Sequence, residues 1–142
     1  MPFDSRRILE SPTGAALNLQ SRHPAGAPRA VVQINHGLAE HSARYERFAD
    51  FLAGRGFAVY AHDHRGHGHT KAADAPQGRF AARDGVSKVL TDVLAVHRLI
   101  AEEHPALPIV LFGHSMGGLI ATSFLLRHSG RIDAAAIWNA NF

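Results

Sequence analysis

Residues 108–126 read PIVLFGHSMGGLIATSFLL, and this stretch decides the fold. Its first five residues form a short apolar run, typical of a buried strand, and its last nine are long and apolar enough to continue as a helix. Between them, residues 113–117 (GHSMG) fit the pattern G-x-S-x-G. We therefore predict a strand, a tight turn and a helix, with Ser115 in the turn.

Such a turn predicts a nucleophilic serine. It forces Ser115 into a sparsely allowed backbone conformation, and glycines at 113 and 117 (Gly113 and Gly117) remove Cβ atoms that would collide with neighbouring chain. The following helix directs its free N–H groups to the point where negative charge develops when an acyl carbonyl is attacked. The alternative is an ordinary glycine-rich turn between a strand and a helix.

The rest of the chain predicts an α/β fold with a largely parallel sheet. Residues 6–10 and 16–21 alternate apolar with polar around the turn signal at 11–14, which indicates an antiparallel hairpin at the sheet's edge. Four further runs are bounded by Gly, Pro or charged residues, as parallel strands buried on both faces are. These four runs are residues 30–35, 58–61, 109–112 and 134–138.

Helical patterns separate these runs, so we expect helices on both faces of the sheet. The first helix has Ser42 as its capping residue and ends at Gly54 or Gly56. The last helix runs from residue 116 to about 128. Residues 71–84 break every periodicity and predict an irregular surface loop.

The middle helix has one apolar face, which starts at Val86. His97 lies on this face and is expected to be a hydrogen-bonded core histidine, and Pro105 ends the helix. Off the face we expect Lys88, Asp92, Glu102 and Glu103, and at the protein surface His23, His104 and His128.

Composition excludes several classes of protein. The chain has 142 residues, 46% of them hydrophobic, which allows one domain at most. It has no cysteine, so disulfides, thiolate zinc sites and cysteine nucleophiles are excluded. The net charge is +3 and the cations are scattered, so no nucleic-acid partner is expected. Because there is neither a signal peptide nor a run near the ~18 apolar residues of a membrane span, we expect a cytoplasmic protein.

A second motif, NHGLAEH at residues 35–41, directly follows the first parallel strand. Acyl transfer needs a second oxyanion donor from a neighbouring strand-to-helix loop. We therefore assign the backbone N–H groups of Leu38 and Met116 to an oxyanion hole. Taken alone, His36 and Gly37 would be a strand-ending turn.

A third motif, HDHRGHGHT at residues 62–70, has four histidines in eight residues. A metal site is one interpretation. Against it, the spacing is not that of a helical H-E-x-x-H motif, and the glycines indicate a tight turn. We expect a loop stabilised by Asp63 and Arg65, with no metal and no cofactor.

Together, these motifs resemble the α/β-hydrolase family, and within it the monoacylglycerol lipase and lysophospholipase group. The resemblance rests on HGLAEHSARY at 36–45, HDHRGHGHT at 62–70 and GHSMGG at 113–118, and their order and spacing match over essentially the whole chain. It implies a serine hydrolase of esters that carry one acyl chain, with a small acyl ester or lipid as substrate.

The resemblance also implies that Glu40, Arg44 and His114 line the polar end of the site, where the glycerol or head group binds. The alternative for Glu40 and Arg44 is a structural ion pair at i and i+4. Ala39 departs from the group, in which many members have glycine. Because alanine tolerates positive φ poorly, we expect this loop to sit slightly differently.

The catalytic triad of this fold follows the order Ser, Asp or Glu, then His. After Ser115 the chain offers Asp133, and its last histidine, His128, precedes that aspartate. Family members also have a cap and further strands. We therefore expect residues 1–142 to be the N-terminal portion of a single α/β-hydrolase domain, nearly inactive alone because a serine without a base is a poor nucleophile.

Two alternatives remain at this point: a non-catalytic fragment that binds a ligand or partner, and a peptidase or haloperoxidase on the same fold. The resemblance allows transient membrane contact through a cap that is missing here. The run at 134–138 would leave an open sheet edge, so we expect poor solubility and self-association.

Overall fold

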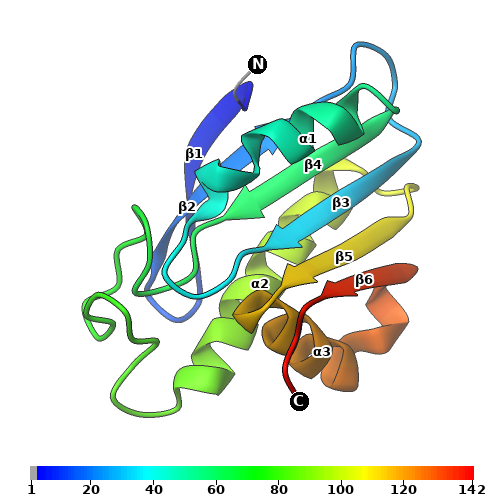
Figure 1. Ribbon diagram of the computed structural model, residues 1–142. Coiled ribbons are helices and arrows are strands. Elements are labelled where there is room, and N and C mark those ends of the chain that lie inside the picture. The colour runs from blue at the N-terminus through cyan, green and yellow to red at the C-terminus, as the bar shows by residue number, and fades with distance from the viewer. Residues whose placement is uncertain (1–2) are drawn as a thin grey trace.

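A six-stranded sheet in the order β1-β2-β4-β3-β5-β6 organises the chain (Figure 1). The computed structural model describes residues 3–142. The β1-β2 hairpin is antiparallel, as predicted, and joins β4 in antiparallel pairing, whereas β3 pairs in parallel with both β4 and β5, and β5 with β6. The strands are β1 (Ser5–Glu10), β2 (Ala16–Arg22), β3 (Ala30–Asn35), β4 (Phe57–His62), β5 (Ile109–His114) and β6 (Ala134–Trp138).

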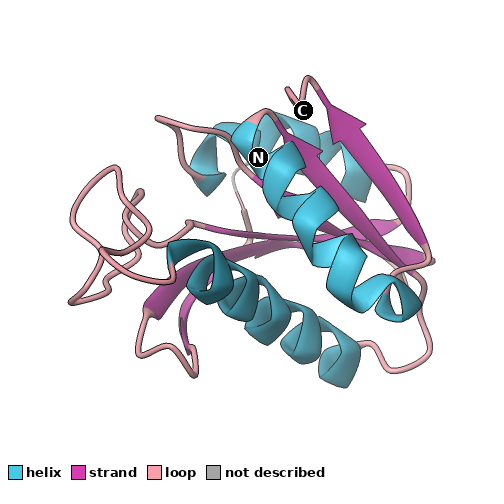
Figure 2. Cartoon of the chain, turned by 90° about the horizontal axis from the view of Figure 1, so that it is seen from below, coloured by secondary structure: helices cyan, strands magenta, loops and turns pink. Residues whose placement is uncertain are grey.

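Helices cover both faces of this sheet, which confirms the predicted α/β class (Figure 2). One face packs against α1 (Glu46–Ala53), and the other against α2 (Gly85–Glu103) and α3 (Met116–His128). Two short 3-10 helices, η1 (Ser42–Tyr45) and η2 (Ser129–Arg131), complete the helical elements. No helix in the described part of the chain is both long enough and apolar enough to cross a membrane.

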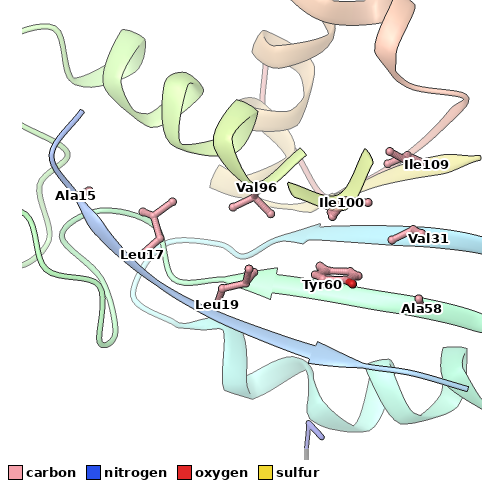
Figure 3. Packing of buried hydrophobic residues seen from close by; sticks show 9 residues of the cluster. All are labelled: Ala15, Leu17, Leu19, Val31, Ala58, Tyr60, Val96, Ile100 and Ile109. Carbon is pink, nitrogen blue, oxygen red and sulfur yellow. The ribbon is translucent and has the colours of Figure 1, made fainter. Parts of the chain in front are cut away.

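Alternation along the parallel strands divides the core into two layers. Val31 and Tyr60 pack with Val96 and Ile100 of α2 (Figure 3), whereas the neighbouring Val32 packs on the α1 side. Successive side chains of a strand point to opposite faces, so strands covered on both sides are apolar at consecutive positions. Within this core, the parallel pairing of β3 with β5 places the carboxyl ends of the two strands beside each other.

The beginning of the first helix differs from the prediction, because Ser42 does not cap it. Ser42 is the first residue of η1, and both its hydroxyl and its backbone N–H donate to Asp63 Oδ1 at 2.7 Å. The α-helix begins only at Glu46 and has Gly54 as its C-cap, as expected.

Two residues of α2 lie on the opposite side from their predicted one. Val86 is 58% exposed, because the buried face of the helix begins at Val89. Asp92 is fully buried and accepts hydrogen bonds from the hydroxyls of Ser11 and Thr13 at 2.5 and 2.6 Å. The periodicity of the helix cannot show this, because these partners come from the β1-β2 turn.

The outer strand β6 also departs from prediction. All five of its residues are exposed, so the expectation that every parallel run is buried on both faces is wrong for this strand. The cause is its position, since β6 has one neighbouring strand within residues 3–142 and lies at the end of the sheet.

Three histidines outside the motifs differ in part from their predicted environments. His97 is buried as predicted, but its Nδ1 has no hydrogen-bond partner within the described residues. His23 and His104 are not free surface residues, because their Nε2 atoms lie 3.4 and 2.9 Å from the hydroxyl of Tyr60.

Candidate active site

Ser115 lies between the end of β5 and the first residue of α3. Its φ of 54° and ψ of −120° fall in a region that side-chain-bearing residues rarely adopt. Its N–H donates to the carbonyl oxygen of Trp138 at 2.9 Å, and its own carbonyl accepts from the N–H of Gly118 at 2.8 Å. The residue is thereby held at the positive end of α3, at the carboxyl edge of the sheet.

Glycine is required on both sides of this serine because backbone fills the space. A Cβ on Gly113 would lie 2.3 Å from the carbonyl oxygen of Gly117. A Cβ on Gly117 would lie 2.0 Å from the carbonyl oxygen of Asn35 and 2.5 Å from that of His36. The turn therefore packs backbone to backbone against the end of β3.

The loop after β3 brings a second set of backbone donors to this turn. A Cβ on Gly37 would be 3.2 Å from the carbonyl oxygen of His114, so the two loops are in contact. Within the described residues, the N–H groups of Leu38 and Met116 have no acceptor. Met116 opens α3, and the first N–H groups of a helix lack intrahelical partners. Both N–H groups are therefore free to donate to another group.

Backbone strain marks this loop as well. Ala39 has a φ of 56°, in the left-handed region that glycine adopts without strain. The loop accommodates alanine in this conformation where a glycine would be unstrained. Its geometry must therefore be held by contacts outside the alanine itself.

Glu40 supplies one of these contacts through a single carboxylate oxygen. Its Oε1 accepts the N–H of Gly37 at 2.5 Å and the hydroxyl of Tyr45 at 2.6 Å, and lies 3.4 Å from His114 Nδ1. Burial raises the pKa of this carboxyl, but hydrogen bonds from Tyr45, Gly37 and His114 outweigh burial and lower the pKa overall. Arg44 adds little to this arrangement, because its Nε is 3.9 Å from Glu40 Oε2 and its side chain is largely exposed.

His36 is the first residue of the same loop, directly after β3, and is fully buried. Its Nδ1 lies 2.7 Å from the carbonyl oxygen of Gly37, and its Nε2 accepts the backbone N–H of His64 at 2.9 Å. Burial is the main cause that lowers the pKa of His36 to about 4, so the ring is neutral at pH 7. The ring thus links the loop after β3 to the loop after β4.

Asp63 and Arg65 anchor the histidine-rich loop by separate networks. Asp63 accepts hydrogen bonds from Asn18, from Ser42 and from the N–H of His69, and these outweigh the burial that raises its pKa, so that the pKa is lowered overall. Arg65 is fully buried and donates to the carbonyl oxygen of Phe80 at 2.7 Å and to Asp74 at 2.5 Å.

Three of the four histidines of this loop, His62, His64 and His67, are buried, whereas His69 is exposed. His62 and His64 are fully buried, and neither ring nitrogen of either residue has a hydrogen-bond partner within the described chain. Among residues 3–142, no three His, Cys, Asp or Glu side chains are placed to hold a metal ion.

Beside the nucleophile turn lies an open hollow of about 590 Å³, between α1, β5 and β6. Its lining combines aromatic side chains with charged and polar groups. It is lined by Glu40, Arg44, Tyr45, Phe48, Phe112, His114, Ala136 and Trp138. The three residues predicted at the polar end of the site are thus brought together here.

Comparison with known proteins agrees with this geometry. The family described as serine aminopeptidase, S33, matches residues 26–142, which is most of the chain. The chain belongs to the serine aminopeptidase S33 family.

The chain is also similar to lipases. The chain is 36% identical over 121 residues to the monoglyceride lipase of Homo sapiens, and 38% identical over 114 residues to the monoacylglycerol lipase of Mycolicibacterium smegmatis. These alignments cover 85% and 80% of this chain, but 38% and 39% of the two relatives. The chain therefore spans less than half the length of the curated relatives it matches.

Solved structures give the same fold. A highly thermostable carboxyl esterase from Bacillus coagulans, in complex with glycerol, superposes with a TM-score of 0.83 at 31% identity, over 95% of this chain and 43% of the esterase. An epoxide hydrolase from Vigna radiata superposes with a TM-score of 0.73 over 92% of this chain and 37% of that enzyme, but at 21% identity, which shows the fold alone. The chain thus has the N-terminal part of the α/β-hydrolase fold, as the motifs predicted.

Two contributors to this S33-family site were absent from the sequence-based set. Tyr45 holds Glu40 through its hydroxyl, and its position at the end of the HGLAEHSARY motif was the available signal. Trp138 contributes its carbonyl oxygen to Ser115, and no sequence signal could have found it because a backbone atom is common to every residue.

The surroundings of the Ser115 hydroxyl bear on how the serine could be activated. Within residues 3–142, no histidine ring is hydrogen-bonded to the Ser115 hydroxyl. The described residues thus bring together the proposed nucleophile, two free N–H groups and a hollow.

Proposed function

We propose that this S33-family chain carries the nucleophile portion of a serine ester hydrolase of the monoacylglycerol lipase or lysophospholipase type. The observation that carries the proposal is the strained Ser115 at the start of α3, beside two backbone N–H groups without acceptors. The lipase relatives support an ester substrate with one acyl chain.

The chemistry follows from these positions. The Ser115 hydroxyl oxygen attacks the ester carbonyl carbon and forms a new C–O bond while its proton passes to a base. The carbonyl oxygen becomes negative, and the N–H groups of Leu38 and Met116 stabilise it, where one such donor contributes about 10²- to 10³-fold in rate. The alcohol then leaves with a proton, and water hydrolyses the acyl-enzyme to release the carboxylic acid and free serine.

The hollow beside the turn suits such a substrate. Phe48 and Phe112 provide apolar contact for hydrocarbon. Glu40, Arg44 and His114 in the same lining can bind hydroxyl groups of a polar head group. The similar carboxyl esterase from Bacillus coagulans was solved in complex with glycerol, which is a polyol.

The triad aspartate and histidine are proposed to come from chain outside these 142 residues. On this basis, residues 1–142 alone hydrolyse esters several orders of magnitude more slowly than a complete enzyme, because serine lacks a general base. Cap-mediated contact with a membrane surface and a cytoplasmic location are parts of the same proposal.

A peptidase is the second candidate, favoured by the description of the family as a serine aminopeptidase. The same nucleophile and N–H groups serve amide and ester hydrolysis, so the site chemistry alone does not separate the two. Substrate assays do.

The test uses the protein expressed from its complete reading frame. We expect hydrolysis of monoacylglycerols or lysophospholipids in preference to aminoacyl amides, and labelling of Ser115 by a fluorophosphonate probe. Ser115→Ala abolishes both, whereas Ser123→Ala, a matched change within α3, leaves both intact. Full esterase activity in Ser115→Ala refutes the proposal, and absent labelling of the wild type favours a non-catalytic binding protein.

A further inference from the structure

The peptide group between Gly37 and Leu38 carries one of the two N–H groups assigned to the oxyanion. Its other polar atom is the carbonyl oxygen of Gly37, which lies 2.7 Å from Nδ1 of His36. The rate effect of an oxyanion donor depends on its direction as well as on its presence. The contact with His36 therefore bears directly on the donor.

The hydrogen bonds of His36 determine which ring nitrogen carries the proton. Its Nε2 faces the backbone N–H of His64 at 2.9 Å, and a backbone N–H can only donate. Nε2 must therefore be the unprotonated acceptor. In a neutral ring the proton then lies on Nδ1, which donates to the Gly37 carbonyl oxygen.

The surroundings of the ring keep it in this neutral state. His36 is fully buried, and the rings of His64 and His67 lie 4.4 and 5.4 Å from it between centroids. A charged imidazole here would lose its hydration and would turn an N–H against the N–H of His64.

Peptide geometry converts this contact into a direction for the donor. The described chain has no cis peptide bond, and in a trans peptide the C=O and the N–H point in opposite directions. A Gly37 carbonyl held toward His36 therefore turns the Leu38 N–H away from His36. The preceding peptide is fixed as well, because the Gly37 N–H donates to Glu40 at 2.5 Å.

We propose that His36 is the positioning residue of the oxyanion hole, and that its Nδ1–H tautomer holds the Gly37 carbonyl so that the Leu38 N–H faces the reacting oxygen. The inference rests on the proposed ester hydrolase function and extends it by naming the group that orients one donor. His36 itself does not touch the substrate. The competing role is a simple bridge between the loops after β3 and β4, through His64.

Two substitutions separate these roles. An asparagine amide nitrogen occupies the place of Nδ1 and an amide oxygen of glutamine the place of Nε2, so His36→Asn keeps the bond to Gly37 and His36→Gln keeps the bond to His64. If His36 orients the peptide, His36→Asn keeps kcat for ester hydrolysis within about tenfold, and His36→Gln lowers kcat about 10²-fold with little change in KM. The reverse ranking, or equal losses in the two variants, overturns the proposal.

A second readout needs no variant and no activity. Nitrogen-15 NMR of the wild-type ring is expected to show a protonated Nδ1 and an unprotonated Nε2. The opposite tautomer overturns the proposal. If the wild type proves inert toward esters, the proposed function fails, and the NMR resonance of the Leu38 amide then tests the positioning role. A resonance that is unchanged in His36→Asn and displaced in His36→Gln supports that role. Any other result refutes it.

Discussion

The backbone N–H of Ser115 donates a hydrogen bond to the carbonyl oxygen of Trp138, 2.9 Å away. This bond joins the strained nucleophile turn to the last residue of β6. Because every residue of β6 is exposed, the strand supports the turn through its backbone, by this bond and by its pairing with β5. The turn therefore depends on an outer strand of the sheet, which is open to pairing with other chains.

We predict that the open side of β6 causes self-association. An outer strand presents unpaired N–H and C=O groups to a second copy, and a charge on the strand opposes such pairing. Sedimentation velocity at increasing concentration should show oligomers of the 142-residue chain, reduced by Ala134→Lys. Ala73→Lys, which adds the same charge at an exposed site in the loop after β4, should leave association unchanged. A wild type that stays monomeric at every concentration contradicts this prediction.

Gly117→Ala should unfold or severely weaken the chain. The new Cβ would lie 2.0 Å from the carbonyl oxygen of Asn35, and neither backbone segment can move without breaking the packing of β3 against the turn. We expect a loss of at least about 3 kcal/mol in the free energy of unfolding, measured by urea denaturation.

The control for this change is Gly130→Ala, where a Cβ meets nothing within 4 Å. It should alter the free energy of unfolding by less than about 1 kcal/mol. Similar effects for the two alanines would show that close packing does not explain Gly117.

The helices and strands could be predicted from the sequence because the spacing of apolar residues along each element follows its secondary structure. Neighbouring residues predict all six strands and the turn at Ser115. They also predict strain at Ala39, which has a positive φ. Asp92 could not be read this way, because its partner Ser11 lies 81 positions away and turns an apparent surface residue into a buried one. The support of Ser115 by Trp138 was equally invisible, because it uses a backbone atom.

Asp92 should contribute to the free energy of unfolding, although the helical periodicity of α2 predicted that it faces solvent. Its Oδ1 accepts the hydroxyls of Ser11 and Thr13, and its Oδ2 lies 3.8 Å from the buried guanidinium of Arg65. Asp92→Ala leaves these donors unpaired and should lower the free energy of unfolding by about 3 kcal/mol.

Glu102→Ala is the matched control, because this residue is exposed on the same helix. Urea denaturation should show a change of at most about 0.5 kcal/mol for this variant. If Asp92→Ala proves as mild as the control, the buried network does not stabilise the fold.

The buried histidines predict a loss of stability in mild acid. Burial lowers the pKa of His36 to about 4 and that of His62 to about 3, from 6.5 in the unfolded chain, and the pKa of His64 is lowered as well. The titratable groups that face His62 are His36, Asp63 and His64, and the ring centroid of His64 lies 4.7 Å from that of His62. Below pH 6.5 the unfolded chain therefore binds protons that the folded chain does not, so stability is complete above pH 6.5 and falls as the pH drops toward these lowered values.

His62→Phe tests this linkage, because neither ring nitrogen of His62 has a hydrogen-bond partner in the described chain. A histidine that stays neutral when folded loses about 1.4 kcal/mol of its contribution per pH unit below 6.5, which amounts to about 2 kcal/mol between pH 7 and pH 5. The loss of unfolding free energy over this interval, from urea denaturation at both pH values, should shrink by that amount in His62→Phe. In His69→Phe, where the ring is exposed, the loss should equal that of the wild type. If His62→Phe and the wild type lose the same free energy between the two pH values, acid does not act on the fold through His62.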